Sequence, residues 1–360
     1  MVASADVVLF VLVLGAIVLL RITLARRSVA PARPDALAAS SPASTPPTHE
    51  TIETVAVSPA ARAKPPHRRA AIGLLSASYT TFAAWMFVAW YRQHKPLSKY
   101  KWGGDGWFGV RTYAGGADKC GHAWSTMAMA RLGTQVLTRI GGYERRRSSL
   151  VSAAMSELCF VGVEVRDGFF YEFSFSDLSG DSIGALLALL FDNIPALNQL
   201  FAYRVEYMPS RAYVRKVLGT SPCPTGGCSR WNIAEDYSGQ TYLAALHLAG
   251  IPAVRQRLGN WSRYVDVAVG FDTRNYKPPP DLDIADPIRQ DLFLGLTLNA
   301  QGIVDHFLEG RSSQTAVRAK QIAHGFFEVF NVPGGTVRLL QTARSGPSRP
   351  VRFPPTPLKV

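Results

Sequence analysis

Seven ionisable residues in the middle of the chain have types and spacings that suit cation binding or proton transfer. They are Asp118, Lys119, His122, Glu164, Asp167, Asp177 and Asp181. Asp118 precedes His122 by four residues and Asp177 precedes Asp181 by four, so each pair would share one face of a helix. Carboxylate oxygens and an imidazole are ligands for divalent cations such as Mg²⁺, Mn²⁺ or Zn²⁺.

Three interpretations of these residues are open at this point. A divalent cation would take its ligands from His122, Glu164, Asp167 and Asp181. Crowded carboxyl groups also raise one another's pKa, which would supply a general acid and a general base. In the structural interpretation, Asp118 and Asp177 cap helices and Lys119 pairs with Glu164.

Three helices are expected to carry these residues, over positions 118–140, about 149–165 and about 181–200. Gly141 and Gly142 are a natural stop for the first helix, and Pro195 should bend the third. An antiparallel hairpin brings the start of one helix beside the end of the next. The sequence therefore predicts that the seven residues meet at one end of a bundle, opposite the basic turn at 145–147.

A family resemblance rests on three segments: Asp118-Lys119-x-x-His122, Glu164-x-x-Asp167-Gly168-Phe169 and Phe175-Ser176-Asp177-x-x-x-Asp181-x-x-Gly184-Ala185. Over residues 102–213 the chain resembles the YfiM-like family of bacterial envelope proteins (domain of unknown function 2279), whose function is unassigned. It is more distantly similar to VanZ-like membrane proteins, although Asp181 stands where those have Asn and Asp167 where they tend to have Gln. The resemblance implies a location in the cell envelope and supplies no reaction.

The N-terminal region reads as a membrane anchor followed by a linker. Residues 7–20 are uncharged and apolar, and the basic residues come after them, which favours an uncleaved transmembrane anchor over 1–27 rather than a signal peptide. Residues 28–69 are rich in Ala, Pro and Ser and basic, which predicts a disordered linker.

The region from 70 to 213 is expected to form the helical bundle. Residues 70–91 contain no charge and are long enough to span a bilayer; a buried helix is the alternative. The fold class expected is mainly α: a membrane-associated helical bundle with an N-terminal hydrophobic anchor and a small C-terminal β-ribbon plus amphipathic helix. By the positive-inside rule, the turn at 145–147 would be cytoplasmic and the ionisable residues would face the periplasm.

Residues 214–340 are expected to be an α+β extension. Alternating apolar residues predict two half-buried antiparallel strands over 264–271 and 291–299, and residues 315–330 predict an amphipathic helix. Cys223 and Cys228 would form a disulfide in an oxidising compartment. Residues 341–360 read as a disordered tail.

Composition and missing motifs narrow the function. The chain has 39 Lys and Arg against 26 Asp and Glu, but these charges flank apolar segments, which favours anionic lipid over nucleic acid. Motifs for nucleotide hydrolysis, Rossmann redox chemistry and serine hydrolysis are absent. The sequence therefore predicts an envelope protein with a structural or ion-binding site. The alternative is a metal-dependent enzyme at the membrane interface. Expected partners are the lipid bilayer, other envelope proteins and a cell-wall or lipid-linked substrate.

Overall fold

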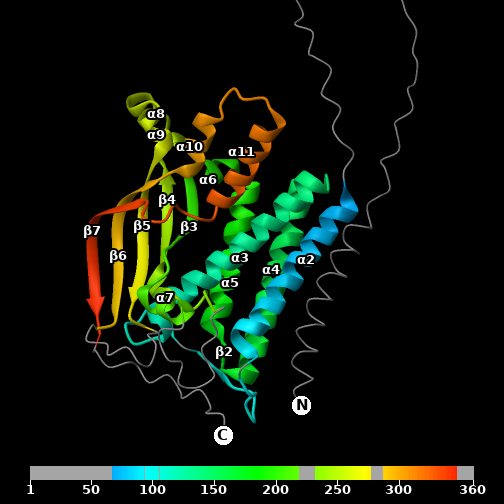
Figure 1. Cartoon of the computed structure of the whole chain (residues 1–360), viewed down its shortest axis with the longest axis vertical. Coiled ribbons are helices and arrows are strands. Elements are labelled where there is room, and N and C mark those ends of the chain that lie inside the picture. The colour runs from blue at the N-terminus through cyan, green and yellow to red at the C-terminus, as the bar shows by residue number, and fades with distance from the viewer. Residues whose placement is uncertain (1–66, 93, 105, 219–231, 277–286, 347–360) are drawn as a thin grey trace, which may run out of the picture.

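The computed structural model of the chain describes residues 67–92, 94–104, 106–218, 232–276 and 287–346. A bundle of long helices lies beside a five-stranded sheet (Figure 1). The expected anchor and most of the expected linker, the pair Cys223 and Cys228, and most of the expected tail lie outside the described residues.

The bundle contains α2 (Arg68–Met86), α3 (Ala117–Gln135), α4 (Arg145–Phe170) and α5 (Phe175–Asn193). A π-helical turn continues α2 through Phe87–Tyr91, and another continues α3 through Val136–Ile140. Apolar side chains such as Leu75, Leu137 and Met155 join α2, the π turn after α3, and α4 in one core.

The ends of these helices follow local sequence signals. The Glu144 carboxylate accepts hydrogen bonds from the backbone N–H groups of the first turn of α4, and Ser174 Oγ accepts one from Asp177 N at the start of α5. Helix α5 ends at Asn193, and Pro195 begins the separate helix α6 (Pro195–Leu200), since proline is well suited to the first turn of a helix.

The sheet is an antiparallel meander in the order β3-β4-β5-β6-β7. Its strands are β3 (Phe201–Tyr207), β4 (Gln240–His247), β5 (Val265–Arg274), β6 (Arg289–Leu298) and β7 (Thr336–Ser345). Short helices lie in the connections between the strands. The connection before β4 contains α7 (Arg211–Leu218), and the connection before β5 contains α8 (Pro252–Leu258) and α9 (Trp261–Tyr264). Strands β6 and β7 are connected by α10 (Ala300–Phe307) and α11 (Gln314–Phe327). Two short strands, β1 (Trp102–Gly103) and β2 (Phe173–Ser174), form a separate parallel pair.

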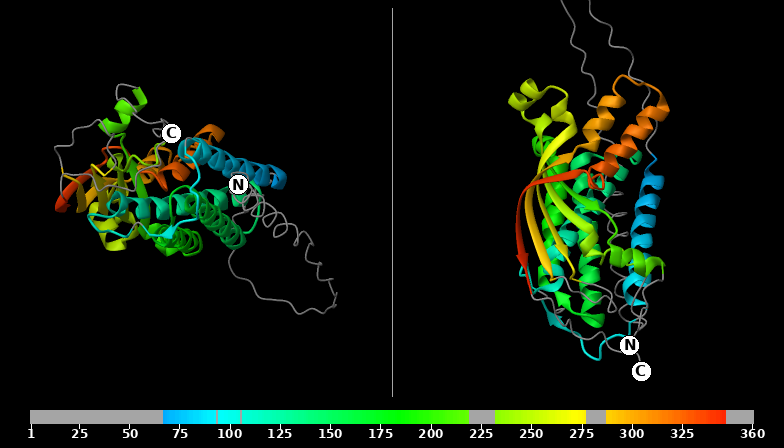
Figure 2. Two further views of the ribbon diagram at one scale, coloured as in Figure 1. Left: turned by 90° about the horizontal axis from the view of Figure 1, so that it is seen from below. Right: turned by 60° about the vertical axis from the view of Figure 1, so that its left-hand side comes forward.

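The sheet is curled, and one side of it packs on the start of α3 (Figure 2). Tyr203 of β3 donates a hydrogen bond to the Cys120 carbonyl of α3 at 2.9 Å. The edge of β3 is also bound by the segment before β7, since Val205 N donates to the Val329 carbonyl at 3.0 Å and Asn331 N donates to the Val205 carbonyl at 2.8 Å. The curl therefore brings the first strand close to the last two.

The expected fold class is wrong. The predicted ribbon is the pair β5–β6 at the centre of a five-stranded sheet, so the protein is a mixed α/β structure rather than a mainly helical bundle. Strand β3 alternates Tyr203, Val205 and Tyr207 with polar residues, but it was missed because it directly follows the helical segment α6. Strand β4 was missed because its apolar residues 242–246 form an unbroken run that has no period of two. Strand β7 extends to Ser345, so residues 341–345 belong to the sheet and not to a tail.

Among the described residues, two helical segments are long and apolar enough to cross a membrane by length and composition. They are Arg68–Tyr91, with 22 % of its most apolar window buried in the protein, and Arg145–Phe170, with 61 % buried. The second resembles the core helix of a globular domain in this respect. A membrane-spanning bundle therefore does not follow from these helices.

Candidate functional site

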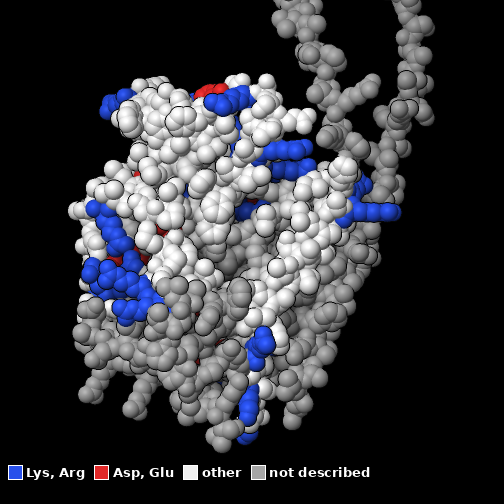
Figure 3. Space-filling view, viewed as in Figure 1, with Lys and Arg blue, Asp and Glu red and all other residues white. Residues whose placement is uncertain are grey.

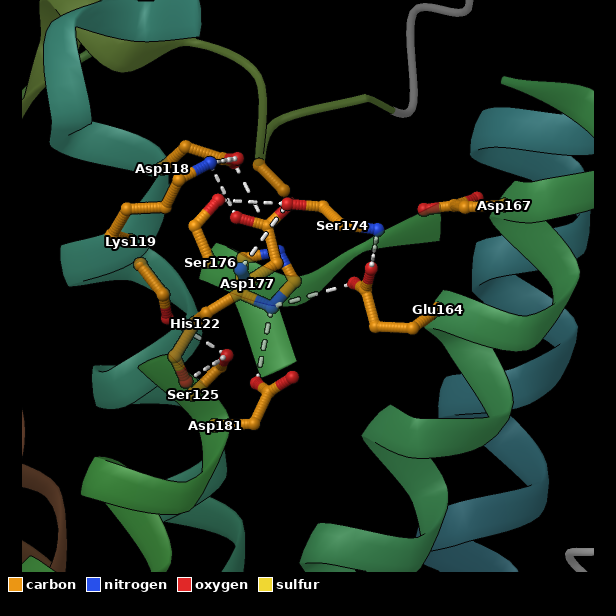
Figure 4. A network of polar contacts seen from close by, with 12 residues as sticks. Asp118, Lys119, His122, Ser125, Glu164, Asp167, Ser174, Ser176, Asp177 and Asp181 are labelled. Carbon is orange, nitrogen blue, oxygen red and sulfur yellow. Dashed lines mark hydrogen bonds and ion pairs between the residues drawn. The ribbon is translucent and has the colours of Figure 1, made fainter. Parts of the chain in front are cut away.

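The ionisable residues meet where the starts of α3 and α5 lie against the end of α4 (Figure 4). Close approach of α3 and α5 makes this possible. A Cβ atom at Gly184 would lie only 2.2 Å from the Ala123 carbonyl oxygen, so a larger residue there would push the two helices apart.

The first part of the cluster is an ion-paired group around Lys119. Its ammonium lies 3.2 Å from Asp118 Oδ2 and 2.5 Å from Asp177 Oδ1. Tyr237, from the turn before β4, donates a hydrogen bond to Asp118 Oδ1 at 2.5 Å. Burial opposes ionisation of Asp118, but the Lys119 ammonium, a protonated His122 and the Tyr237 hydroxyl together hold the pKa of this carboxyl below its usual value.

The second part of the cluster is formed by His122, Glu164 and Asp181. His122 Nδ1 lies 3.0 Å from Asp181 Oδ1 and 4.0 Å from Glu164 Oε1. Thr126 donates to Asp181 Oδ1 at 2.8 Å, and the backbone N–H of Ser174 donates to Glu164 Oε2 at 3.0 Å. The other oxygens, Glu164 Oε1 and Asp181 Oδ2, are buried and have no hydrogen-bond partner within the described part of the chain.

The pKa values of His122 and Glu164 are both raised. Burial, together with the neighbouring Asp167, Asp177 and Asp181 carboxylates, raises the pKa of Glu164 well above its usual range, against the effect of a protonated His122. Burial disfavours the charged form of His122, but Asp181 and the nearby carboxylates outweigh it and raise the pKa of the imidazole well above its usual value. In the absence of a cation, both shifts favour the protonated forms of His122 and Glu164.

Asp167 lies apart from both groups. It is one turn along α4 from Glu164 and accepts a hydrogen bond from the Tyr91 hydroxyl at 2.6 Å. Burial raises the pKa of Asp167 to about 7. Within the described ranges, two sets of side chains have ligand atoms within 4.8 Å of one another, namely Asp118–His122–Asp177 and His122–Glu164–Asp181, and Asp167 belongs to neither.

The structural interpretation of the sequence is wrong in its details. The residue before α3 that acts as N-cap is Gly116, with a φ of +88°, and Asp118 bonds to Tyr237 instead of capping the helix. The lysine pairs with Asp118 and Asp177 rather than with Glu164. Ser174, not Asp177, caps α5.

Among the residues that contact the predicted site, Thr126, Ser174 and Tyr237 were missed from the sequence, and the first two have a signal in hindsight. Thr126 follows His122 by four residues and so shares its helix face. Ser174 has the residue type and place of an N-cap. Tyr237 comes from a distant segment, and no local pattern links it to Asp118.

A second buried polar network fills the inner face of the curled sheet. Asp266 accepts hydrogen bonds from Arg204 Nη1 at 3.0 Å and Asn299 Nδ2 at 2.9 Å, and it lies 2.9 Å from His247 Nδ1. Asp272 is paired with Arg338 and, at 3.4 Å, with Arg274. In this network each buried carboxylate has a basic partner.

The fold and the site together define a mixed α/β protein whose helical bundle encloses a cluster of buried acidic groups around one lysine and one histidine. Residues 104–193 match the model of a family described as a predicted periplasmic lipoprotein (DUF2279). That segment contains α3, α4 and α5, and with them all seven predicted site residues. The match supports an envelope, periplasmic protein of unassigned role, and it supports the DUF2279 part of the resemblance but neither the YfiM-like nor the VanZ-like part.

No curated protein and no solved structure was found to match the chain.

Proposed function

We propose that this chain is a periplasmic envelope protein that binds a divalent transition-metal ion through His122, Glu164 and Asp181. The observation that carries the proposal is a pair of buried carboxylate oxygens beside the imidazole, Glu164 Oε1 and Asp181 Oδ2, that have no hydrogen-bond partner among the residues that the structure describes. Leaving buried charged oxygens without partners is costly, and a cation would remove that cost.

The charge of the cluster also favours a cation. Five carboxyl groups (Asp118, Glu164, Asp167, Asp177 and Asp181) lie around one lysine and one histidine. Protons can neutralise part of this excess, in keeping with the raised pKa values of Glu164 and Asp167. A bound dication would do so without protonating the carboxylates.

The Glu164 side of the cluster suits a metal better than the Lys119 side. On the Lys119 side, the ammonium already lies between Asp118 and Asp177 and would repel a second cation. On the other side, His122 Nδ1 is 3.0 Å and 4.0 Å from the two carboxylates. Tetrahedral ligands with bonds of about 2.1 Å are about 3.4 Å apart, so small side-chain movements would complete the coordination.

Holding oxygen atoms at fixed distances needs support from neighbouring groups, and both carboxylates have it. Ser174 N fixes one oxygen of Glu164, and Thr126 fixes one oxygen of Asp181. With one nitrogen and two oxygens, the ligand set favours Zn²⁺ or Mn²⁺ over Mg²⁺, which prefers oxygen ligands and retains water.

The test is the metal content of the purified full chain after equilibration with Zn²⁺ and removal of unbound ion. We expect about one zinc per chain, and loss of that ion in His122→Ala and Glu164→Gln. Removal of the ion with a chelator should lower the melting temperature, since a ligand at 100 times its Kd stabilises a protein by about 2.7 kcal/mol.

Glu157→Gln is the matched control. Glu157 lies on the same helix two turns before Glu164, and it accepts a hydrogen bond from Ser182 at 2.7 Å. This variant should bind zinc like the unmodified chain. If Glu164→Gln also binds zinc or manganese normally, or if neither ion binds the unmodified chain, the proposed metal site is wrong.

A further inference from the structure

The outer side of the curled sheet carries exposed apolar side chains, whereas its inner side combines charged groups with a small buried apolar cluster around Leu243 and Phe293. The alternating residues of β5, β6 and β7 that point away from the sheet interior are 38 % to 68 % exposed: Val269, Leu292, Leu294, Leu296, Val337 and Leu340. The residues between them face inward and are buried, among them Phe293, Thr297 and Asp272. We call the six exposed residues the outer apolar face.

The strand register makes this face continuous. Val269 of β5 pairs with Leu294 of β6, which pairs with Leu340 of β7, and Leu296 pairs with Val337 in the next row. Paired residues in an antiparallel sheet lie on the same side. Helix α3 covers the same side of the sheet only over β3, β4 and one end of β5, where Val205, Tyr242 and Phe271 pack against it. The outer apolar face lies beyond that contact.

Most charged groups on the inner side of the sheet have partners there. Asp266 is bound by Arg204 and Asn299, while Glu206 of β3 accepts hydrogen bonds from Asn331 at 2.9 Å and from Thr336 at 2.6 Å across the curl. A sheet folded in water would normally turn its apolar side inward. The opposite arrangement, with polar groups inside and apolar side chains outside, is the one that hydrocarbon selects.

Aromatic and basic residues frame the outer apolar face. At one end, Phe108 packs against Phe271 with ring centroids 5.6 Å apart, and Trp107 beside it is exposed. Arg111 of the same loop and Arg344 of β7 are exposed as well. At the other end of the strands, the helices before β5 and after β6 carry the exposed aromatics Trp261 and Phe307.

The length of this face and the charge of the residues around it match those expected of a surface that contacts a lipid bilayer. Leu298, which is 40 % exposed, continues this face along β6. From Leu292 to Leu298 the strand rises by about 3.3 Å per residue, or about 20 Å in all, close to the apolar band of about 25 Å seen on lipid-facing sheets. Aromatic rings gather at the boundary between hydrocarbon and headgroups, and arginines attract anionic headgroups. The whole chain has a net charge of +13, and on the side of the molecule drawn in Figure 3 basic side chains are more prominent than acidic ones, which favours association with anionic lipid.

We infer that the outer apolar face of β5–β7 is a lipid-contacting surface that lies against the hydrocarbon of a membrane containing anionic lipid. The surface is distinct from the proposed metal site and does not depend on it. A second copy of the chain is the main competing occupant, since β7 is an edge strand with no further neighbour among the described strands.

The inference can be tested by labelling single introduced cysteines with an environment-sensitive fluorophore in the full chain. Leu294→Cys and Leu340→Cys place the label on the outer apolar face. Gln341→Cys is the matched control, because Gln341 is the neighbour of Leu340 on the same strand, but its side chain turns inward to donate a hydrogen bond to Asp291 at 2.7 Å. All variants carry Cys223→Ser and Cys228→Ser. Burial raises the pKa of Cys120 and of Cys159 to about 12, so these thiols should stay unlabelled.

Labelled chains are mixed with vesicles of phosphatidylethanolamine and phosphatidylglycerol that contain a lipid with a quencher on its acyl chain. We expect quenching several-fold stronger at positions 294 and 340 than at 341, with a blue shift of emission at 294 and 340 only. Equal quenching at all three positions, or none at 294 and 340, would overturn the inference. Absence of quenching together with cross-linking between the cysteines of two chains at 294 would assign the face to a second copy.

Discussion

The bundle and the sheet both bury charged groups, but they balance those charges differently. In the sheet, Asp266 lies among Arg204, His247 and Asn299, so its negative charge is matched by neighbours of this same chain. In the bundle, the acidic groups around Lys119 and His122 outnumber the basic ones. Burial is common to the two networks. The imbalance of charge is what separates a candidate binding site from a structural network.

The largest predicted effect is on the balanced network. Asp266→Ala would leave the guanidinium of Arg204 buried without its carboxylate, since both side chains are at most 1 % exposed. Removal of one partner of a buried ion pair typically costs about 3–5 kcal/mol. We therefore expect the free energy of unfolding, measured with denaturant, to fall by about that amount.

In the bundle, the substitution to compare with Asp266→Ala is Glu164→Gln, measured in the metal-free chain. It removes an excess acidic group while retaining an acceptor for the backbone N–H of Ser174. The free energy of unfolding should stay the same or rise. If this variant is as destabilising as Asp266→Ala, the two networks are alike and the charge argument for a cation fails.

The helical part of the site was accessible from the sequence because connectivity alone determines it. Two antiparallel helices bring residue 118 near residue 164 whatever their packing details, and the glycines after residue 140 locate the turn between them. The partners of each side chain were not accessible. Lys119 could have reached several carboxylates, and the choice of Asp118 and Asp177 depends on the helix rotation in the folded bundle.

The sheet shows a different limit of sequence analysis. Alternation in β5 and β6 correctly predicted two antiparallel strands and which residues share a face. It could not tell which face is covered, because the period of two is the same for a sheet buried by helices and for one turned outward. Leu292 belongs to the face that a water-soluble sheet would bury, yet it is 53 % exposed.

A smaller effect, and one that depends on pH, is predicted for Asp167. Burial raises its pKa from 3.8 to about 7, so the folded chain binds this proton more tightly than the unfolded chain does. The contribution of Asp167 to stability is therefore complete below about pH 4 and is lost as the pH rises through about 7. Asp167→Asn should flatten this part of the pH profile while still accepting the hydrogen bond from Tyr91.

The change in slope is measurable by denaturant unfolding of the metal-free chain at a series of pH values. A shift of one pKa unit corresponds to about 1.4 kcal/mol, and partial exposure of Asp167 to water reduces the effect, so about 1–2 kcal/mol is expected across the window. The same series of unfolding measurements on Asp266→Asn provides the comparison with a carboxyl group of the sheet network. A profile for Asp167→Asn that still falls between pH 4 and 7 would show that Asp167 is not a source of the excess charge.

The smallest effect is expected at a helix cap that touches the bundle cluster. Ser174 contributes two separate groups: its Oγ caps α5 by accepting from Asp177 N at 3.2 Å, and its backbone N–H holds Glu164. Ser174→Ala removes the first and keeps the second. The loss of an N-cap costs about 1 kcal/mol.

Ser313, which caps α11 away from the cluster by accepting from Ala316 N at 3.2 Å, provides the matched substitution. Equal losses of stability in Ser174→Ala and Ser313→Ala, with unchanged zinc content, would mean that the carboxylate of Glu164 is positioned by the backbone alone. A selective loss of zinc in Ser174→Ala would instead make the start of α5 part of the metal site. Ser174 both caps α5 and holds the proposed ligand Glu164 through its backbone N–H, whereas Ser313 caps a helix away from the cluster.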